Sequence, residues 1–269
     1  MRKICLPLLL VFFGVSATEY RPWFGEDKLI EITPAYTYQY VPQVDSGGTT
    51  FSKHSNNHFA SLSVSAQTDC TWAVQGEVDT AATAVQGYHF EDYKLTLRYR
   101  PLSDCEGDPF SLTGGISVSQ VSTAARRDLY TFHPGQMEYE AHLAIGKESI
   151  CRQYWTSRVW GMFGAGIANR GSPWLRAIFG YDKNHWNCYH YGVYVEGLLG
   201  LGEHELLLNQ PFRGYGAIKY RSLDITGYFT QPVGSVGKLT LEYTLRPWAY
   251  NFPTYSHAFT IKLSIPYAL

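Results

Sequence analysis

The chain has 269 residues, a net formal charge of −1 and a mean hydropathy of −0.19. A charge so close to zero does not suggest a nucleic-acid partner. Beyond the first residues, no apolar run approaches the roughly 18 residues that a membrane helix needs. Aromatic residues make up 16% of the chain, with 21 tyrosines, and such residues favour β-strands and membrane interfaces.

The N-terminal stretch is typical of a secretory signal peptide. Arg2 and Lys3 form a short positive region, an apolar run follows from Ile4 to Phe13, and small residues lead up to Ala17. The alternative, a membrane anchor, is less favoured because the apolar run is too short for about 30 Å of hydrocarbon. We therefore expect cleavage after Ala17, with residues 18–269 forming one exported domain.

The exported part alternates apolar and polar residues with a period of two, which is the pattern of β-strands, and it contains no convincing helical stretch. Twelve strands are predicted, each short enough to fit a barrel strand with its turn or loop. Their approximate positions are 30–40, 61–65, 72–79, 93–100, 116–119, 138–145, 158–168, 174–181, 188–200, 215–229, 238–246 and 259–269.

Alternation alone does not say which strand face meets water. In a soluble sandwich the apolar face points inward, whereas in a membrane barrel it meets lipid and the polar face lines the lumen. Three features favour the membrane barrel: the signal peptide, the pattern of the last strand, and a polar face with charges of both signs flanked by aromatic residues. The tryptophans that we assign to interfacial girdles are Trp23, Trp72, Trp155, Trp174, Trp186 and Trp248.

The last strand carries the most specific pattern, because the sequence HAFTIKLSIPYAL alternates to its final residue. It is similar to the signal read by the barrel-assembly machinery, although it ends on Leu269 rather than on an aromatic residue and contains Pro266. The residues of this assembly signal are Phe259, Ile261, Leu263, Ile265, Tyr267 and Leu269.

On this strand and on its architecture, the chain resembles the bacterial outer-membrane β-barrel superfamily, without matching a closer family of known activity. The resemblance covers the whole exported part. It implies an all-β fold, a transmembrane antiparallel up-and-down β-barrel of about 12 strands, within a range of 10–14. It also implies an outer-membrane location in a Gram-negative envelope, with outer-membrane lipid and the barrel-assembly machinery as partners.

An even number of strands places both termini on the periplasmic side. The outward-facing connections then include the longer ones, at about 41–58, 80–92, 121–137, 201–214 and 247–257. The periplasmic connections are mostly shorter, at about 67–71, 101–111, 147–157, 182–187 and 230–237.

All four cysteines of the exported part fall in or beside periplasmic connections in this topology. They are Cys70, Cys105, Cys151 and Cys188. An exported chain meets an oxidising compartment, and neighbouring positions favour disulfides Cys70–Cys105 and Cys151–Cys188. Cross-links to other envelope proteins and four free thiols are the alternatives. Because there is no CxxC spacing, no metal site is predicted.

The polar strand faces carry acidic and basic residues in similar numbers, and in a membrane barrel they line the lumen. Such an interior could be a narrow aqueous channel or could be closed by ion pairs between its side chains. The lumen-lining candidates are Glu77, Lys94, Arg98, Arg100, Glu138, Glu140, His142, Arg176, His190, Glu196, Glu242, Arg246 and Lys262.

A narrow porin-like channel for small solutes is the function that this pattern favours. The alternatives are a structural envelope protein cross-linked through its periplasmic cysteines and a surface adhesin acting through its polar loops. An outer-membrane lipid hydrolase is less favoured, because neither His142 nor His190 is followed two positions later by serine. Glu138, Glu140 and His142 share a strand face, and we interpret them as lumen lining rather than as an acid–base set. We expect no catalytic residue and no cofactor.

Overall fold

The structure is a computed structural model, and it describes residues 20–25, 29–68, 71–151, 154–234 and 236–268. The predicted signal peptide, Cys70 and Leu269 lie outside the described residues. Within the described ranges, no helix is long and apolar enough to cross a membrane.

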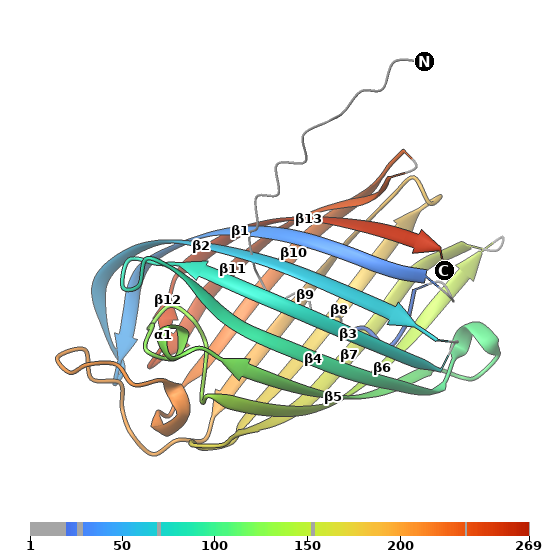
Figure 1. Cartoon of the computed structure of the whole chain (residues 1–269). Coiled ribbons are helices and arrows are strands. Elements are labelled where there is room, and N and C mark those ends of the chain that lie inside the picture. The colour runs from blue at the N-terminus through green and yellow to red at the C-terminus, as the bar shows by residue number, and fades with distance from the viewer. Residues whose placement is uncertain (1–19, 26–28, 69–70, 152–153, 235, 269) are drawn as a thin grey trace.

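The strands form one antiparallel sheet that closes on itself as a barrel (Figure 1). Each long strand pairs with the next long strand along the chain, and β1 also pairs with β13, which closes the ring. The predicted fold class, a barrel of twelve strands, is confirmed. The strands are β1 (Leu29–Ser46), β2 (Thr49–Gln67), β3 (Trp72–Ala82), β4 (Tyr88–Leu102), β5 (Ser111–Val121), β6 (Met137–Cys151), β7 (Tyr154–Ala168), β8 (Trp174–His185), β9 (Tyr189–Gly200), β10 (Arg221–Val233), β11 (Gly237–Tyr250) and β13 (Ser256–Ala268), with the two-residue β12 (Pro253–Thr254) added beside β1.

Successive residues of each strand face opposite sides of the barrel wall. The outward side chains are large and apolar: Leu95, Phe163 and Phe179 are 57%, 56% and 63% exposed. Many inward side chains are small or polar, and Thr96 and Thr113 are fully buried. An apolar surface that surrounds the molecule is far larger than a water-soluble monomer exposes, and it matches the lipid-facing band of a membrane barrel.

The two ends of the barrel differ. β1 begins and β13 ends at the same end, since Leu29 pairs with Ala268, and we call this end the terminal rim. The opposite end, the loop rim, carries the long loops 122–136 and 201–220 (Figure 1). The short helical elements are η1 (Asp104–Glu106) at the terminal rim and α1 (Thr123–Arg126) and η2 (Tyr215–Ala217) at the loop rim.

The first hairpin is longer than predicted. The connection expected at about 41–58 is wrong, because β1 and β2 continue to a turn at Gly47 and Gly48, which both have positive φ. The apolar alternation stops well before this turn, but polar residues continue the ladder. Ser55 and Asn57, for example, are buried on the inward face.

The tenth strand begins later than predicted, at Arg221 rather than near residue 215. Tyr215 lies in η2, and its ring packs with that of Tyr220 in a cluster at the loop rim instead of joining a ladder. Aromatic residues just ahead of a strand can therefore belong to a folded loop rather than to the strand itself.

Candidate functional site in the barrel lumen

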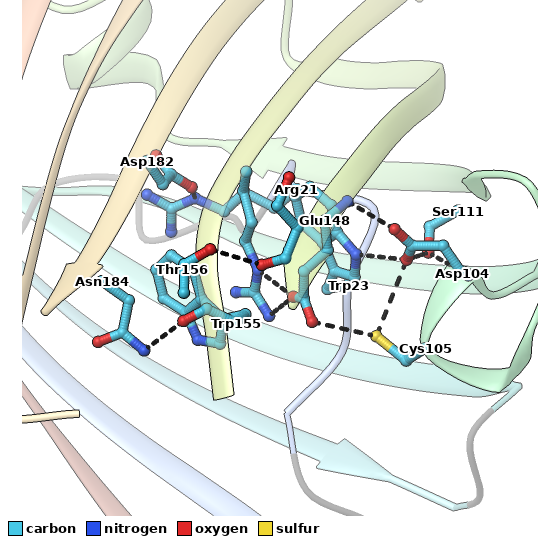
Figure 2. A network of polar contacts seen from close by, with 12 residues as sticks. Arg21, Trp23, Asp104, Cys105, Ser111, Glu148, Trp155, Thr156, Asp182 and Asn184 are labelled. Carbon is cyan, nitrogen blue, oxygen red and sulfur yellow. Dashed lines mark hydrogen bonds and ion pairs between the residues drawn. The ribbon is translucent and has the colours of Figure 1, made fainter. Parts of the chain in front are cut away.

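Residues 20–25, which precede β1, lie inside the barrel, and we call them the plug segment. The Tyr20 hydroxyl donates to the Glu140 carboxylate on β6 at 3.2 Å. The Trp23 indole N–H donates to Asp104 Oδ1 in η1 at 3.0 Å. Figure 2 shows this end of the plug segment among polar side chains near the terminal rim. The plug segment therefore crosses the inner part of the lumen from mid-depth to the rim.

The backbone of the plug segment is also held. Arg98 on β4 donates to the Arg21 carbonyl at 3.1 Å, and Thr113 on β5 donates to the Pro22 carbonyl at 2.6 Å. The Arg21 guanidinium lies 3.2 Å from the buried Asp182 carboxylate on β8 (Figure 2). Because these partners lie on three different strands, the segment is fixed against the wall at several points.

A glycine makes room for the plug segment. A Cβ atom on Gly146 would lie 2.6 Å from the Trp23 ring and 2.8 Å from Pro22, which is closer than real contacts allow. The Arg158 guanidinium lies over the Trp23 indole, 4.7 Å from a ring centroid. Because Gly146 has no side chain, the Trp23 indole can pack directly against the inward face of β6.

Two tryptophans do not lie where the sequence predicted. Trp23 and Trp174 were assigned to interfacial girdles, but they are 5% and 2% exposed and both point into the lumen. Each indole N–H donates to a carboxylate: that of Trp23 to Asp104, and that of Trp174 to Glu140 at 3.1 Å. By contrast Trp72, Trp186 and Trp248 are exposed on the outer surface, as a girdle requires.

The loop rim is covered by an aromatic and aliphatic cluster, which we call the cap. It joins the two long loops to the ends of the strands, and Tyr215 at its centre is 1% exposed and donates to the Leu129 carbonyl at 2.5 Å. The residues of the cap are Val44, Leu129, Tyr130, Phe132, Ala168, Trp174, Leu198, Leu206, Leu208, Phe212, Tyr215, Ile218, Tyr220, Ala249 and Phe252.

His133 ties loop 122–136 to the barrel wall. Its ring Nε2 lies 3.0 Å from a Glu91 oxygen on β4, and its Nδ1 lies 3.6 Å from a Glu138 oxygen on β6. Its carbonyl accepts from the Tyr215 N–H, which links this loop to η2. Burial alone would lower the pKa of His133, but hydrogen bonds and charge from Glu138 and Glu91 outweigh burial and raise that pKa well above its ordinary value.

We expect the cap to loosen as the pH rises. Because the pKa of His133 is higher in the folded state, its contribution to stability is complete below about pH 6.5 and is lost as the pH rises through the raised pKa. Limited proteolysis of loop 122–136 should therefore accelerate in alkaline buffer. His133→Asn should remove this pH dependence and His257→Asn, a change at another histidine, should not. An unchanged profile in His133→Asn would contradict the assignment.

A cavity of about 430 Å³ lies between the plug segment and the cap. Tyr20 and Arg21 border it on one side and the loop residues Tyr130–His133 on the other. The lumen-lining candidates that the structure brings together around it are Lys94, Glu138, Glu140, Arg176, Glu196, Glu242, Arg246 and Lys262. Lining residues that sequence reasoning did not select include Glu91, Asp92 and Asp224.

The other five candidates lie away from this cavity. Glu77, Arg98 and His142 are buried on inward faces of β3, β4 and β6. Arg100 points toward η1 at the terminal rim, and His190 packs edge-on against aromatic rings.

Ion pairs join inward-facing side chains of neighbouring and next-neighbouring strands along the lumen wall. Arg176 on β8 lies 2.7 Å from Glu196 and 3.3 Å from Glu140, so one guanidinium serves two carboxylates. Arg246 on β11 makes a two-point contact with Asp224 on β10, at 2.6 and 2.7 Å. Paired in this way, the charges can remain in a lumen that is screened from bulk water.

Lys262 is held in the same manner, 3.0 Å from Glu242 on the adjacent strand. The last strand otherwise presents its predicted assembly residues to the outside: Phe259, Ile261 and Tyr267 are 44%, 40% and 53% exposed, and Leu263 and Ile265 are half-buried.

Cys105, Cys151 and Cys188 are free and exposed, all near the terminal rim. The predicted Cys151–Cys188 disulfide is therefore not formed in the structure. Cys151 ends β6 and Cys188 precedes β9, so β7 and β8 lie between them. At about 4.8 Å per strand, that distance exceeds the Cα separation of about 7 Å that a disulfide tolerates. The predicted Cys70–Cys105 disulfide is not formed either, since Cys105 is free; Cys70 itself lies outside the described residues.

The lumen offers charged and aromatic surface rather than a metal centre. Among the described residues, no group of three or more histidine, cysteine, aspartate or glutamate side chains could hold a metal ion. Glu138 pairs with His133, whereas Glu140 accepts from Trp174 of the cap and from Tyr20 of the plug segment, so Glu140 joins the cap to the plug segment.

No protein-family model and no curated protein matches the sequence. The fold is similar to that of an outer membrane channel from Pseudomonas putida F1, with a TM-score of 0.68 and 8% identity over 94% of this chain and all of that one. It is also similar to the NanC porin (TM-score 0.60, 8% identity, 87% of this chain and 98% of that one). The KdgM porin gives a TM-score of 0.53 at 11% identity over 87% and 99% of the two chains. The chain thus shares the β-barrel fold of these channels and porins.

Proposed function

We propose that this outer-membrane-type β-barrel is a channel that passes small polar solutes through a lumen narrowed by the plug segment and the cap. The observation that carries the proposal is the polar cavity of about 430 Å³ inside a closed barrel. A barrel of twelve strands lies between small barrels filled by side chains and wide porins, so a narrow pathway is the expected outcome. The porin-like fold supports the same function.

The proposal includes the location. The apolar outer surface needs lipid around it, and the N-terminal stretch supports export through a cleaved signal peptide. The folded protein should sediment with the outer membrane and should migrate differently on a denaturing gel with and without boiling. Recovery in the soluble fraction would contradict the membrane assignment.

Planar-bilayer recording tests the channel. Full-length protein folded in detergent should give small, reproducible current steps, and liposome swelling should fall off steeply with the size of the added sugar. Boiled protein is the matched control. If neither full-length protein nor a chain without the plug segment conducts, the channel proposal fails.

A second candidate function, a structural envelope protein, is favoured by one observation. Cys105, Cys151 and Cys188 are all exposed near the same rim, where a partner's thiol could reach them. Envelope fractions separated on non-reducing gels should then show a larger adduct that disappears on reduction and in a variant lacking these cysteines. The same migration with and without reductant would leave this candidate without support.

A further inference from the structure

We infer that the wall of the cavity formed by β3 and β4 binds an organic cation, namely the amine or guanidinium group of a small solute. Its place in transport rests on the proposed function, whereas binding itself does not.

Carboxylates outnumber cationic side chains around the cavity, with eight of the former against five arginines and lysines. The arginines and Lys262 are already engaged. Their partners are Asp182 for Arg21, Glu140 and Glu196 for Arg176, Asp224 for Arg246, and Glu242 for Lys262. Lys94 on β4 also lines the cavity, but it lies over the Tyr20 ring and close to Glu77 and Glu140. The surplus of negative charge therefore falls on the rest of the wall formed by β3 and β4, which carries Asp79, Glu91 and Asp92.

Asp79 is the group on this wall that most needs a partner. Its side chain is 5% exposed and lines the cavity, yet its Oδ1 atom has no hydrogen-bond partner. The charged groups with the largest effect on its carboxylate are Glu77, Glu91 and Asp92, and all three are acids. A buried carboxylate whose strongest charged neighbours are acids requires either a proton or a cation beside it.

Asp92 strengthens the case, because its side chain is 6% exposed and lies within hydrogen-bond reach of Asp79. Two carboxyl groups so close together cannot both carry a charge unless a cation lies near both. Glu91, beside them, is already joined to His133. The open position is therefore next to Asp79 and Asp92.

An organic cation fits better than a metal ion. Among the residues that the structure describes, no cluster has the ligands of a metal site. The cavity is also bordered by the rings of Phe59, Tyr130 and Phe132, and aromatic faces attract ammonium and guanidinium groups. Its volume lies in the range of small-molecule sites, which typically measure about 300–1,000 Å³.

The test compares three probes with the same carbon skeleton: putrescine, the neutral butanediol and the anionic succinate. Calorimetric titration of the full-length barrel in detergent should show saturable binding of putrescine only. Asp79→Asn combined with Asp92→Asn should weaken that binding at least about tenfold, because the hydrogen bonds lost are charge-assisted. Glu203→Gln, which removes one charge from an exposed loop residue, should leave binding unchanged.

Heat-dependent gel migration checks that each variant is folded, and Asp79→Asn alone replaces the double variant if the latter does not fold. Equal binding of all three probes, or unchanged putrescine affinity in the folded asparagine variants, would overturn the inference. The two proposals fail separately. A barrel that binds putrescine but never conducts overturns the channel alone, and one that conducts without binding putrescine overturns the inference alone.

Discussion

Removal of residues 1–25 is expected to raise the single-channel conductance of the refolded barrel severalfold. The plug segment contributes no strand to the sheet, which begins at Leu29, so the barrel can close without it. Its large side chains, Tyr20 and Trp23, occupy the lumen itself, where they exclude water and ions. Planar-bilayer recording of the truncated and full-length chains, refolded side by side, measures the difference.

Gly146→Val tests the same claim in the full-length chain. The valine Cβ would collide with the Trp23 ring, so the ring should be displaced from the inward face of β6. The hydrogen-bonded pairing of β6 with β5 should remain. Gly76→Val on β3 is the matched control, because a Cβ there meets nothing within 4 Å. Conductance should rise in Gly146→Val and stay unchanged in Gly76→Val. Equal conductance in truncated, Gly146→Val and full-length proteins would show that the plug segment does not obstruct the lumen.

Sequence reasoning predicted the wall of the barrel but not what fills it. Each strand repeats one constraint, apolar outward and polar inward, so the period-two pattern identifies the strands and their number. Residues 20–25 obey no such repeat. A signal did exist, since Tyr20, Trp23 and Phe24 place three large rings ahead of the first strand, but Trp23 there looks like an ordinary girdle residue.

The cap was missed for a related reason. Loop 201–220 contains Leu206, Leu208, Phe212 and Tyr215, which is more apolar surface than an exposed loop needs. This excess could have predicted a folded lid. Its partners, however, come from distant strands, and no local periodicity reveals contacts of that kind. The pairing of Asp79 with Asp92 was likewise hidden, because it depends on the register between β3 and β4.

Tyr215→Ala is expected to open the cap without unfolding the barrel. The ring is fully buried among Phe132, Tyr220 and Phe252, and its hydroxyl bonds to loop 122–136. Truncating a buried aromatic side chain costs about 3 kcal/mol or more, and here the loss falls on two loops rather than on the ladder. Proteolysis of the loops should accelerate, while heat-dependent gel migration should still show a folded barrel. Tyr88→Ala, at a residue 70% exposed, is the control.

The conductance effect of Tyr215→Ala should depend on the plug segment. Two constrictions along one lumen act as electrical resistances in series. Removing the smaller resistance, at the cap, changes the total conductance little while the larger resistance, at the plug segment, remains. With the plug segment in place, Tyr215→Ala should therefore raise conductance only slightly. In the chain without residues 1–25, where the cap has become the main obstruction, the same substitution should raise it strongly. An equal increase in both backgrounds would mean that solutes pass the plug segment and the cap by separate routes, which contradicts a single cavity lying between them.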